Sequence, residues 1–377
     1  MALACAALHA QPAAPLLLRE HWAIQSSAMV TDAGDVVSKP GYKTTGWYPA
    51  SMPSTVVAAL VNAHVYPDPA FGMNLRAISG ESYPIGMNFS NVHMPPDSPY
   101  RVPWWFRTEF QAPVEHKGGT LWLRFDGINY RANVWLNGKR IADSGSMAGA
   151  WRLFEYNVTE AVRPGANALA VEVFAPLPDD LAITFVDWNP GMPDKGMGLW
   201  RDVHLDATGP VAIRFPQAIT HLNPPANDKA DLTVSAEVVN GTKHSVSGTL
   251  KGEIEGIAFS QEVRLAGNET KVVKFTPDKF AQLAIANPRL WWPIQVGTPN
   301  LYTLKLQFET GGAVSDESVS RFGIREVTSI LDEQNHRVFR INGKNILIRG
   351  AGYTFDMMLR SSPETLAVAG SLPNPLE

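Results

Sequence analysis

The feature that most limits the folds open to this 377-residue chain is a period-two alternation of apolar and polar side chains, broken by tight-turn signals. Residues 121–125 and 132–136 alternate in this way, and Asn137-Gly138 directly follows the second run. An Asn-Gly pair between two alternating runs favours a β-hairpin with a type I′ turn. Helical spacing is clear only near residues 54–61. The sequence therefore predicts a mainly β protein.

Composition narrows the classes of function. Hydrophobic residues make up 45% and charged residues 18%, which is typical of a globular protein with a packed core. The net charge is -4 and there is no basic run, so we expect no nucleic-acid partner. No stretch approaches the roughly 20 apolar residues of a membrane-spanning helix, so we expect no membrane partner. The nine histidines lack metal-ligand spacing and no glycine loop could cradle phosphate, so we predict neither a metal site nor a cofactor.

Length and turn signals divide the chain into domains. The chain is too long for one ordinary core. Asp206 through Pro210 is the predicted boundary between the first β-region and a second one. Beyond it, roughly seven alternating runs in about 110 residues favour an immunoglobulin-like sandwich, although the cysteine pair of antibody domains is absent. The single cysteine, Cys5, excludes an internal disulfide.

The first residues have the character of a processing segment. Residues 1–18 are rich in alanine and leucine and carry a small-x-small pattern at Ala7-Leu8-His9-Ala10. This composition favours a signal-peptide remnant, and it predicts a protein exported to the periplasm or secreted. The alternative is an ordinary frayed terminus, because no basic residues precede the apolar stretch.

Five segments in order resemble glycoside hydrolase family 2. No single one is decisive, but the ordered set is specific. The segments are Trp47–Val56, Trp104–Phe110, Met197–Val203, Asn287–Tyr302 and Phe322–Arg325.

The resemblance implies a fold and a division of the chain. In that family a jelly-roll-like sugar-binding β-sandwich and an immunoglobulin-like β-sandwich precede a (β/α)8 catalytic barrel. We therefore expect the signal remnant at 1–18, the jelly-roll domain at 19–209 and the immunoglobulin-like domain at 210–325. The first strand of an incomplete barrel is expected within 326–360, followed by a divergent tail at 361–377.

The groups that would cleave a sugar are not found in the sequence. A retaining glycosidase needs two carboxyl groups about 5–5.5 Å apart. The resemblance places both as glutamates late in the barrel, the acid after an asparagine. The Asn-Glu pair of this chain, Asn268-Glu269, instead lies in a predicted turn of the second sandwich. We therefore expect a chain truncated near the start of the barrel, with no catalytic residue.

Candidate sugar contacts come from the same resemblance. Relatives use a loop of the first domain to wall the substrate pocket, which implies roles for Asp187, Trp188 and Asp194. A carboxylate accepts hydrogen bonds from sugar hydroxyls, and an indole covers the apolar face of a pyranose. Tyr353 and Asp356 follow the expected first barrel strand, where such barrels bind substrate. The alternatives are a surface turn for the loop and a helix cap for Asp356.

Two functions follow from these observations. The first is the N-terminal part of a retaining, exo-acting β-glycosidase that hydrolyses O-glycosidic bonds at the end of a β-linked oligosaccharide. A β-glucosaminide or a β-mannoside is the expected substrate, and the chain alone is expected to be inactive. The second is a non-catalytic carbohydrate-binding or scaffold module built from the same two β-domains. A later Asn-Glu pair in the downstream reading frames would distinguish the first from the second.

Overall fold

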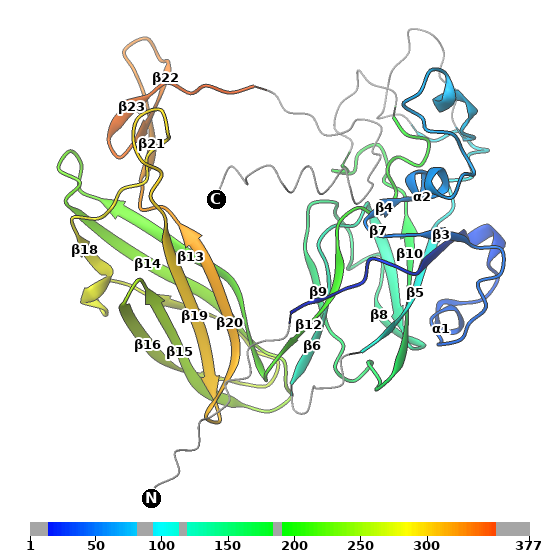
Figure 1. Cartoon of the computed structure of the whole chain (residues 1–377), viewed down its shortest axis with the longest axis horizontal. Coiled ribbons are helices and arrows are strands. Elements are labelled where there is room, and N and C mark those ends of the chain that lie inside the picture. Colours follow the sequence, from blue (N-terminus) through cyan, green and yellow to red (C-terminus); the bar gives the residue numbers. More distant parts are fainter. Residues whose placement is uncertain (1–13, 81–92, 113–118, 184–190, 352–377) are drawn as a thin grey trace, which may run out of the picture.

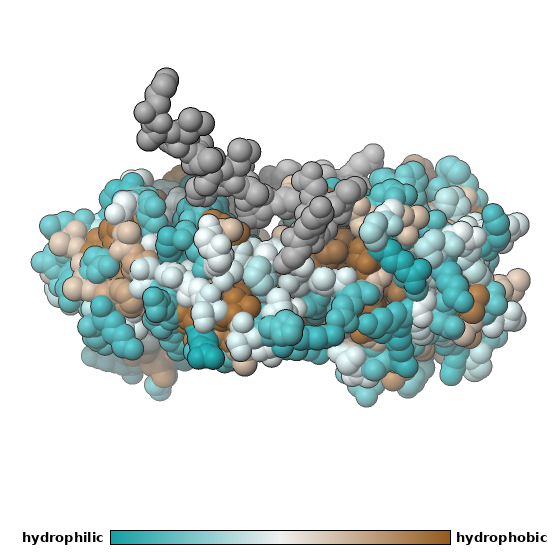
Figure 2. All heavy atoms as spheres, turned by 90° about the horizontal axis from the view of Figure 1, so that it is seen from below, coloured by the Kyte–Doolittle hydropathy of each residue, from teal (hydrophilic) through white to brown (hydrophobic). Residues whose placement is uncertain are grey.

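A computed structural model describes residues 14–80, 93–112, 119–183 and 191–351 of the chain. These residues form two β-sandwiches that lie side by side, followed by a small third sheet next to the second sandwich (Figure 1). Seen from below, hydrophobic residues form separate patches on a mostly hydrophilic face (Figure 2).

The first sandwich contains two large antiparallel sheets and a short strand pair. The six-stranded sheet has the order β3 (Tyr48–Ala50), β2 (Trp22–Ser26), β5 (Trp104–Gln111), β10 (Ala166–Phe174), β7 (Arg131–Leu136) and β8 (Lys139–Ala142). The four-stranded sheet has the order β1 (Leu16–Leu17), β12 (Val203–Thr208), β6 (Thr120–Phe125) and β9 (Phe154–Asn157). The pair is β11 (Gly198–Leu199) with β4 (Ser54–Thr55). The α-helices are α1 (Gly34–Val37) and α2 (Val56–Asn62), and the short 3-10 turns are η1 (Ser27–Met29) and η2 (Asn74–Ala77).

Alternation in the sequence becomes alternation in burial. In β7, Ala132, Val134 and Leu136 are buried, and the residues between them are partly exposed. The core that they join includes fully buried Phe106 and Phe125. Each phenylalanine contributes about 1.5–3 kcal/mol when removed from water. The first sandwich therefore has an apolar core between its two sheets, as the period-two pattern predicts.

Two local predictions in this domain are confirmed. Asn137 and Gly138 have positive φ values of 53° and 85° and connect β7 to β8, which is the geometry of a type I′ hairpin. The predicted helix is α2, whose first turn is capped by Thr55. The Thr55 hydroxyl accepts a hydrogen bond from the Ala58 N–H at 3.2 Å.

The second sandwich packs two further antiparallel sheets around its own core. One sheet contains β13 (Val211–Leu222), β14 (Lys229–Asn240) and β17 (Thr270–Phe275), with β18 (Ala284–Ala286) paired to β14. The other has the order β16 (Ile257–Leu265), β15 (Val246–Ile254), β19 (Tyr302–Thr310) and β20 (Ala313–Phe322), and the 3-10 turn η3 (Ala281–Leu283) precedes β18. Asn268-Glu269 connects β16 to β17, and Asn268 has a φ of 59°. The predicted turn at this pair is thus confirmed.

The connection between the sandwiches is only two residues long. β12 ends at Thr208 and β13 begins at Val211. Gly209 donates its N–H to the Ser315 carbonyl at 2.6 Å, and a Cβ on Gly209 would lie 2.8 Å from the Ser315 Cα. The Val211 N–H donates to the Ser315 hydroxyl at 2.8 Å. Close backbone packing therefore replaces a linker between β12 and β13.

The third sheet is a three-stranded meander of β21 (Val327–Leu331), β22 (Arg337–Ile341) and β23 (Lys344–Ile346). Asn342-Gly343 forms the tight turn between β22 and β23, with φ values of 51° and 79°. β23 pairs antiparallel with β22 and ends at Ile346. Leu347 and Ile348, which lie in the range 326–360 where the first barrel strand is expected, follow β23 with 76% and 60% of their surface exposed.

The N-terminal residues extend the first sandwich. Leu16 and Leu17 pair with β12, and buried Leu18 donates its N–H to the Val203 carbonyl at 2.8 Å. The last residues of the predicted signal remnant therefore belong to this sandwich, and residues 1–13 lie outside the described part of the chain. Within the described ranges, no helix is long and apolar enough to cross a membrane.

Candidate functional site

The structure describes one of the five predicted sugar contacts. Asp194 lies in the segment that joins residue 191 to β11. The other four, Asp187, Trp188, Tyr353 and Asp356, lie outside the described residues, so their roles stay predictions.

Asp194 anchors this segment to α2. Its side chain is fully buried. One carboxylate oxygen accepts the Val57 N–H at 2.7 Å, and the other accepts the Gly196 N–H at 2.9 Å. Burial raises the pKa of Asp194 to about 6, and the hydrogen bonds from the backbone N–H groups oppose that rise. Asp194 has no exposed surface in this structure, and its predicted sugar contact stays a prediction.

Asn129 holds the same segment through further hydrogen bonds. Its side-chain amide donates to the carbonyls of Lys195 and Gly196 at 3.0 and 2.9 Å. Its backbone N–H and carbonyl pair with Gly198 at 2.9 and 2.8 Å. The buried Oδ1 of Asn129 has no hydrogen-bond partner among the described residues. Together Asn129 and Asp194 fix residues 194–198 immediately after the predicted sugar-contact loop.

A pair of tryptophans flanks the beginning of that loop. The rings of Trp151 and Trp200 meet edge to face, with centroids 4.8 Å apart and an interplanar angle of 75°. The Trp151 indole N–H donates to the Ala182 carbonyl at 3.2 Å, and the Trp200 indole N–H donates to the Ala150 carbonyl at 3.0 Å. Trp151 remains 51% exposed. The pair therefore places a fixed aromatic surface beside the segment that leads into residue 184.

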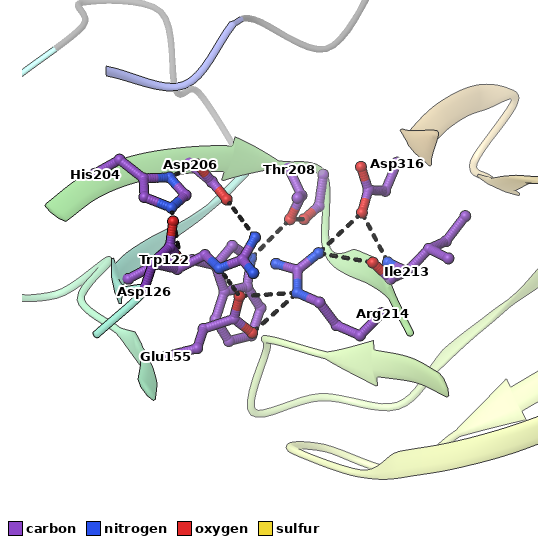
Figure 3. A network of polar contacts seen from close by, with 11 residues as sticks. Trp122, Asp126, Glu155, His204, Asp206, Thr208, Ile213, Arg214 and Asp316 are labelled. Atoms are coloured by element: carbon purple, nitrogen blue, oxygen red, sulfur yellow. Dashed lines mark hydrogen bonds and ion pairs between the residues drawn. The ribbon is translucent and has the colours of Figure 1, made fainter. Parts of the chain in front are cut away.

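A second polar cluster lies where the sandwiches meet (Figure 3). His204 contacts Asp206 at 2.7 Å through Nδ1 and Asp126 at 3.3 Å through Nε2. Burial lowers the pKa of His204, but hydrogen bonds to the two carboxylates outweigh burial and raise it to about 9. His204 is therefore protonated at neutral pH. Arg124 adds a further contact to Asp206 at 3.1 Å.

Arg214 extends this cluster across the domain boundary. From β13 its Nε donates to the Glu155 carboxylate of β9 at 2.8 Å, and its Nη1 lies 3.3 Å from Asp316 of β20. The guanidinium also lies 5.4 Å from the Trp122 ring centroid, a cation–π distance. Figure 3 shows these side chains converging from both sandwiches.

The chemistry of this cluster is that of a structural network. A retaining glycosidase needs one protonated carboxyl group facing one ionised carboxylate across a gap. Here Asp206 contacts His204 and Arg124, and both Glu155 and Asp316 contact Arg214. Each acidic group is thus paired with a cation, and the Glu155–Arg214 pair joins the two sandwiches. Among the described residues, no group of three His, Cys, Asp or Glu side chains could hold a metal ion.

Comparison with known proteins places these domains in a family. The model of the glycosyl hydrolase 2 galactose-binding domain-like family matches residues 97–185, and that of glycosyl hydrolases family 2 matches residues 211–325. The chain belongs to glycosyl hydrolase family 2, as its sequence segments predict.

Several of its relatives are exo-β-D-glucosaminidases. The protein from Streptomyces avermitilis is 38% identical over 340 residues, which cover 90% of this chain and 36% of that protein. The protein from Hypocrea jecorina is 34% identical over 351 residues, 91% of this chain and 37% of that protein. The crystal structure of the Amycolatopsis orientalis exo-chitosanase CsxA superimposes with a TM-score of 0.79 at 35% identity, covering 94% of this chain and 39% of that one. The chain thus spans little more than a third of the length of these relatives.

Sequence reasoning missed Asn129, Trp151 and Arg214. Asn129 lies in a short connection between β6 and β7, and nothing in its spacing marks it. Trp151 contacts a residue 31 positions away, and Arg214 contacts one 59 positions away. Only the abundance of tryptophan, at 11 copies, hinted at an aromatic surface.

Proposed function

We propose that this chain supplies the sugar-binding, N-terminal part of a retaining, exo-acting β-glycosidase that acts on β-glucosaminide ends. The observation that carries this proposal is the identity of 38% with the exo-β-D-glucosaminidase of Streptomyces avermitilis over 90% of this chain. In support, the related CsxA has been crystallised in complex with PNP-β-D-glucosamine. The β-mannoside alternative has weaker support, from a 28% identical mannosylglycoprotein endo-β-mannosidase of Lilium longiflorum.

In this proposal the first sandwich binds the sugar and the 377-residue chain alone does not cleave it. Hydrolysis with retention needs a carboxylic acid and a carboxylate facing each other across the glycosidic bond. The acidic side chains of the interdomain cluster contact cations, and Asp194 accepts backbone N–H groups. The anchored segment at residues 194–198 holds the end of the predicted sugar-contact loop in place.

The same proposal includes export to the periplasm or the exterior, supported by the composition of residues 1–18. Fractionation of cells that express the full gene tests it. Protein found in the cytosol alone would contradict export.

The main experiment separates binding from turnover. Purified chain is titrated with glucosamine, mannose and their β-1,4-linked disaccharides, and binding is followed by saturation-transfer NMR. In parallel, release of nitrophenol from nitrophenyl β-D-glucosaminide is followed with an enzyme-free control. We expect saturable binding of the glucosamine series without nitrophenol release. Release above the control would contradict the predicted inactivity, and an absence of binding to any of these sugars would contradict the proposed function. Binding spread evenly over unrelated glycans on an array would favour a general carbohydrate-binding module.

A further inference from the structure

Trp151 is a large aromatic side chain that is both exposed and fixed. Trp151 has 51% of its surface exposed to solvent. The indole N–H is already bonded to the Ala182 carbonyl, and the ring edge contacts Trp200. Covering the ring with a ligand would therefore leave no donor unsatisfied, and it would remove apolar surface from water.

The loop that carries Trp151 is rigid. It connects β8 to β9, and the Asp143 carboxylate closes its first turn by accepting the N–H groups of Gly145 and Ser146, both at 3.0 Å. Its middle is tied to Tyr130, whose carbonyl accepts the Gly149 N–H at 3.0 Å. An aromatic side chain held in this way loses little conformational entropy when a ligand stacks on it, so it is preorganised for binding.

The two tryptophans are not equivalent for a ligand. The Arg201 guanidinium lies 5.0 Å from the centroid of Trp200 and occupies that ring as a cation–π partner. Trp200 also packs at the edge of Trp151 and is only partly exposed. Trp151 is therefore the ring of the pair that is left for a ligand.

The position of Trp151 along the chain relates it to the predicted sugar contacts. Its hydrogen-bond acceptor, Ala182, precedes Asp187 by five residues. The indole is thus tied to described residues that shortly precede the predicted sugar-contact loop. Two leucines close in sequence to Trp151 and Ala182, Leu153 and Leu181, are also exposed, at 48% and 74%.

We propose that Trp151 forms a second sugar subsite, on which a further pyranose ring of a β-linked oligosaccharide stacks through its C–H face. This inference rests on the proposed function and deepens it, since it predicts recognition of more than the terminal sugar. A ligand that stacks on an aromatic pair of this kind should gain up to about tenfold in affinity.

The test compares a monosaccharide with a disaccharide. Wild-type chain, Trp151→Ala and Trp151→Phe are titrated with glucosamine and with its β-1,4-linked dimer. We expect the wild type to prefer the dimer about fivefold, Trp151→Ala to lose the preference, and Trp151→Phe to keep most of it. Phe215→Ala is the matched control, because Phe215 is 62% exposed on β13 of the other sandwich. This control should behave as the wild type.

A direct readout keeps the test independent of folding effects. The protein is labelled with 5-fluorotryptophan, and the fluorine resonance of Trp151 is assigned from its loss in Trp151→Phe. That resonance should shift with the dimer and not with the monosaccharide. A resonance that does not respond to the dimer, or a dimer preference retained by Trp151→Ala, would overturn the subsite and assign the exposed ring to another partner. Binding of both sugars with equal affinity would refute this inference alone, whereas no binding of either sugar would refute the proposed function as well.

Discussion

Replacement of Asp194 by asparagine tests the role of a fully buried carboxylate in the loop anchor. The pKa of Asp194 is raised from 3.8 to about 6, chiefly by burial. The folded protein therefore binds this proton more tightly than the unfolded chain does. Between about pH 4 and pH 6 the free energy of unfolding must fall as pH rises, because the unfolded chain loses the proton first. A rise of this size corresponds to about 3 kcal/mol.

The Asp194→Asn variant cannot ionise and removes this dependence. Its amide oxygen can accept only one of the two N–H groups, from Val57 or Gly196, and its own NH2 faces the other donor. That mismatch costs about 1–3 kcal/mol at every pH and lowers the absolute stability of the variant. The decisive quantity is thus the change of the wild-type-minus-variant difference with pH, because other titrating groups cancel in it.

The assay is urea unfolding followed by tryptophan fluorescence from pH 4 to pH 7, with ¹³C NMR of the Asp194 carboxyl carbon as a local measurement. We expect the difference in unfolding free energy to fall by about 2.4 kcal/mol over this range, most of the full linkage value. We also expect the carboxyl resonance to titrate with a midpoint near 6. A difference that stays constant with pH, or a midpoint below 4, would refute the reasoning.

Three further outcomes follow from the interdomain cluster and from one glycine. Arg214→Met leaves Glu155 without its strongest partner across the boundary and should lower the free energy of urea unfolding by about 2 kcal/mol; an unchanged midpoint would show that the contact carries no stability. His204→Gln removes a group whose folded pKa is raised from 6.5 to about 9. The advantage of the wild type in free energy of unfolding should therefore be full below pH 6.5 and lost as pH rises through 9. Unfolding at pH 6 and pH 10 measures it, and an advantage that persists at pH 10 would contradict the assignment. Gly198→Ala places a Cβ 2.4 Å from the Ser54 carbonyl oxygen and should cost more than about 2 kcal/mol in thermal unfolding; an unaltered melting temperature would count against this close packing of β11 on β4.

Features set by neighbouring residues were predictable from the sequence. The Asn137-Gly138 hairpin follows from the positive φ that both residues tolerate, and the start of α2 follows from the capping hydroxyl of Thr55. The boundary near Gly209 follows from a turn signal between two alternating runs. The same logic assigned Asn268-Glu269 to a turn, which its structure confirms.

The site was less predictable because its contacts join distant parts of the chain. Asp194 accepts the N–H of Val57, 137 positions away, so its burial could not be read from the residues around it. Period-two alternation tells which side chains share a face, but it does not say which loops meet at the end of a sandwich.

The two-residue connection at Gly209 restricts how the two sandwiches can move relative to each other. Gly209 packs closely against Ser315, and the Asn157 side-chain amide donates to the Gly241 carbonyl at 2.7 Å, so contacts on both sides of the connection oppose a rotation of one sandwich relative to the other. A polypeptide bound to the far end of the second sandwich would therefore also determine the orientation of the loops of the first sandwich. In the proposed function, the orientation of the bound sugar would then depend on this connection as much as on the loops themselves.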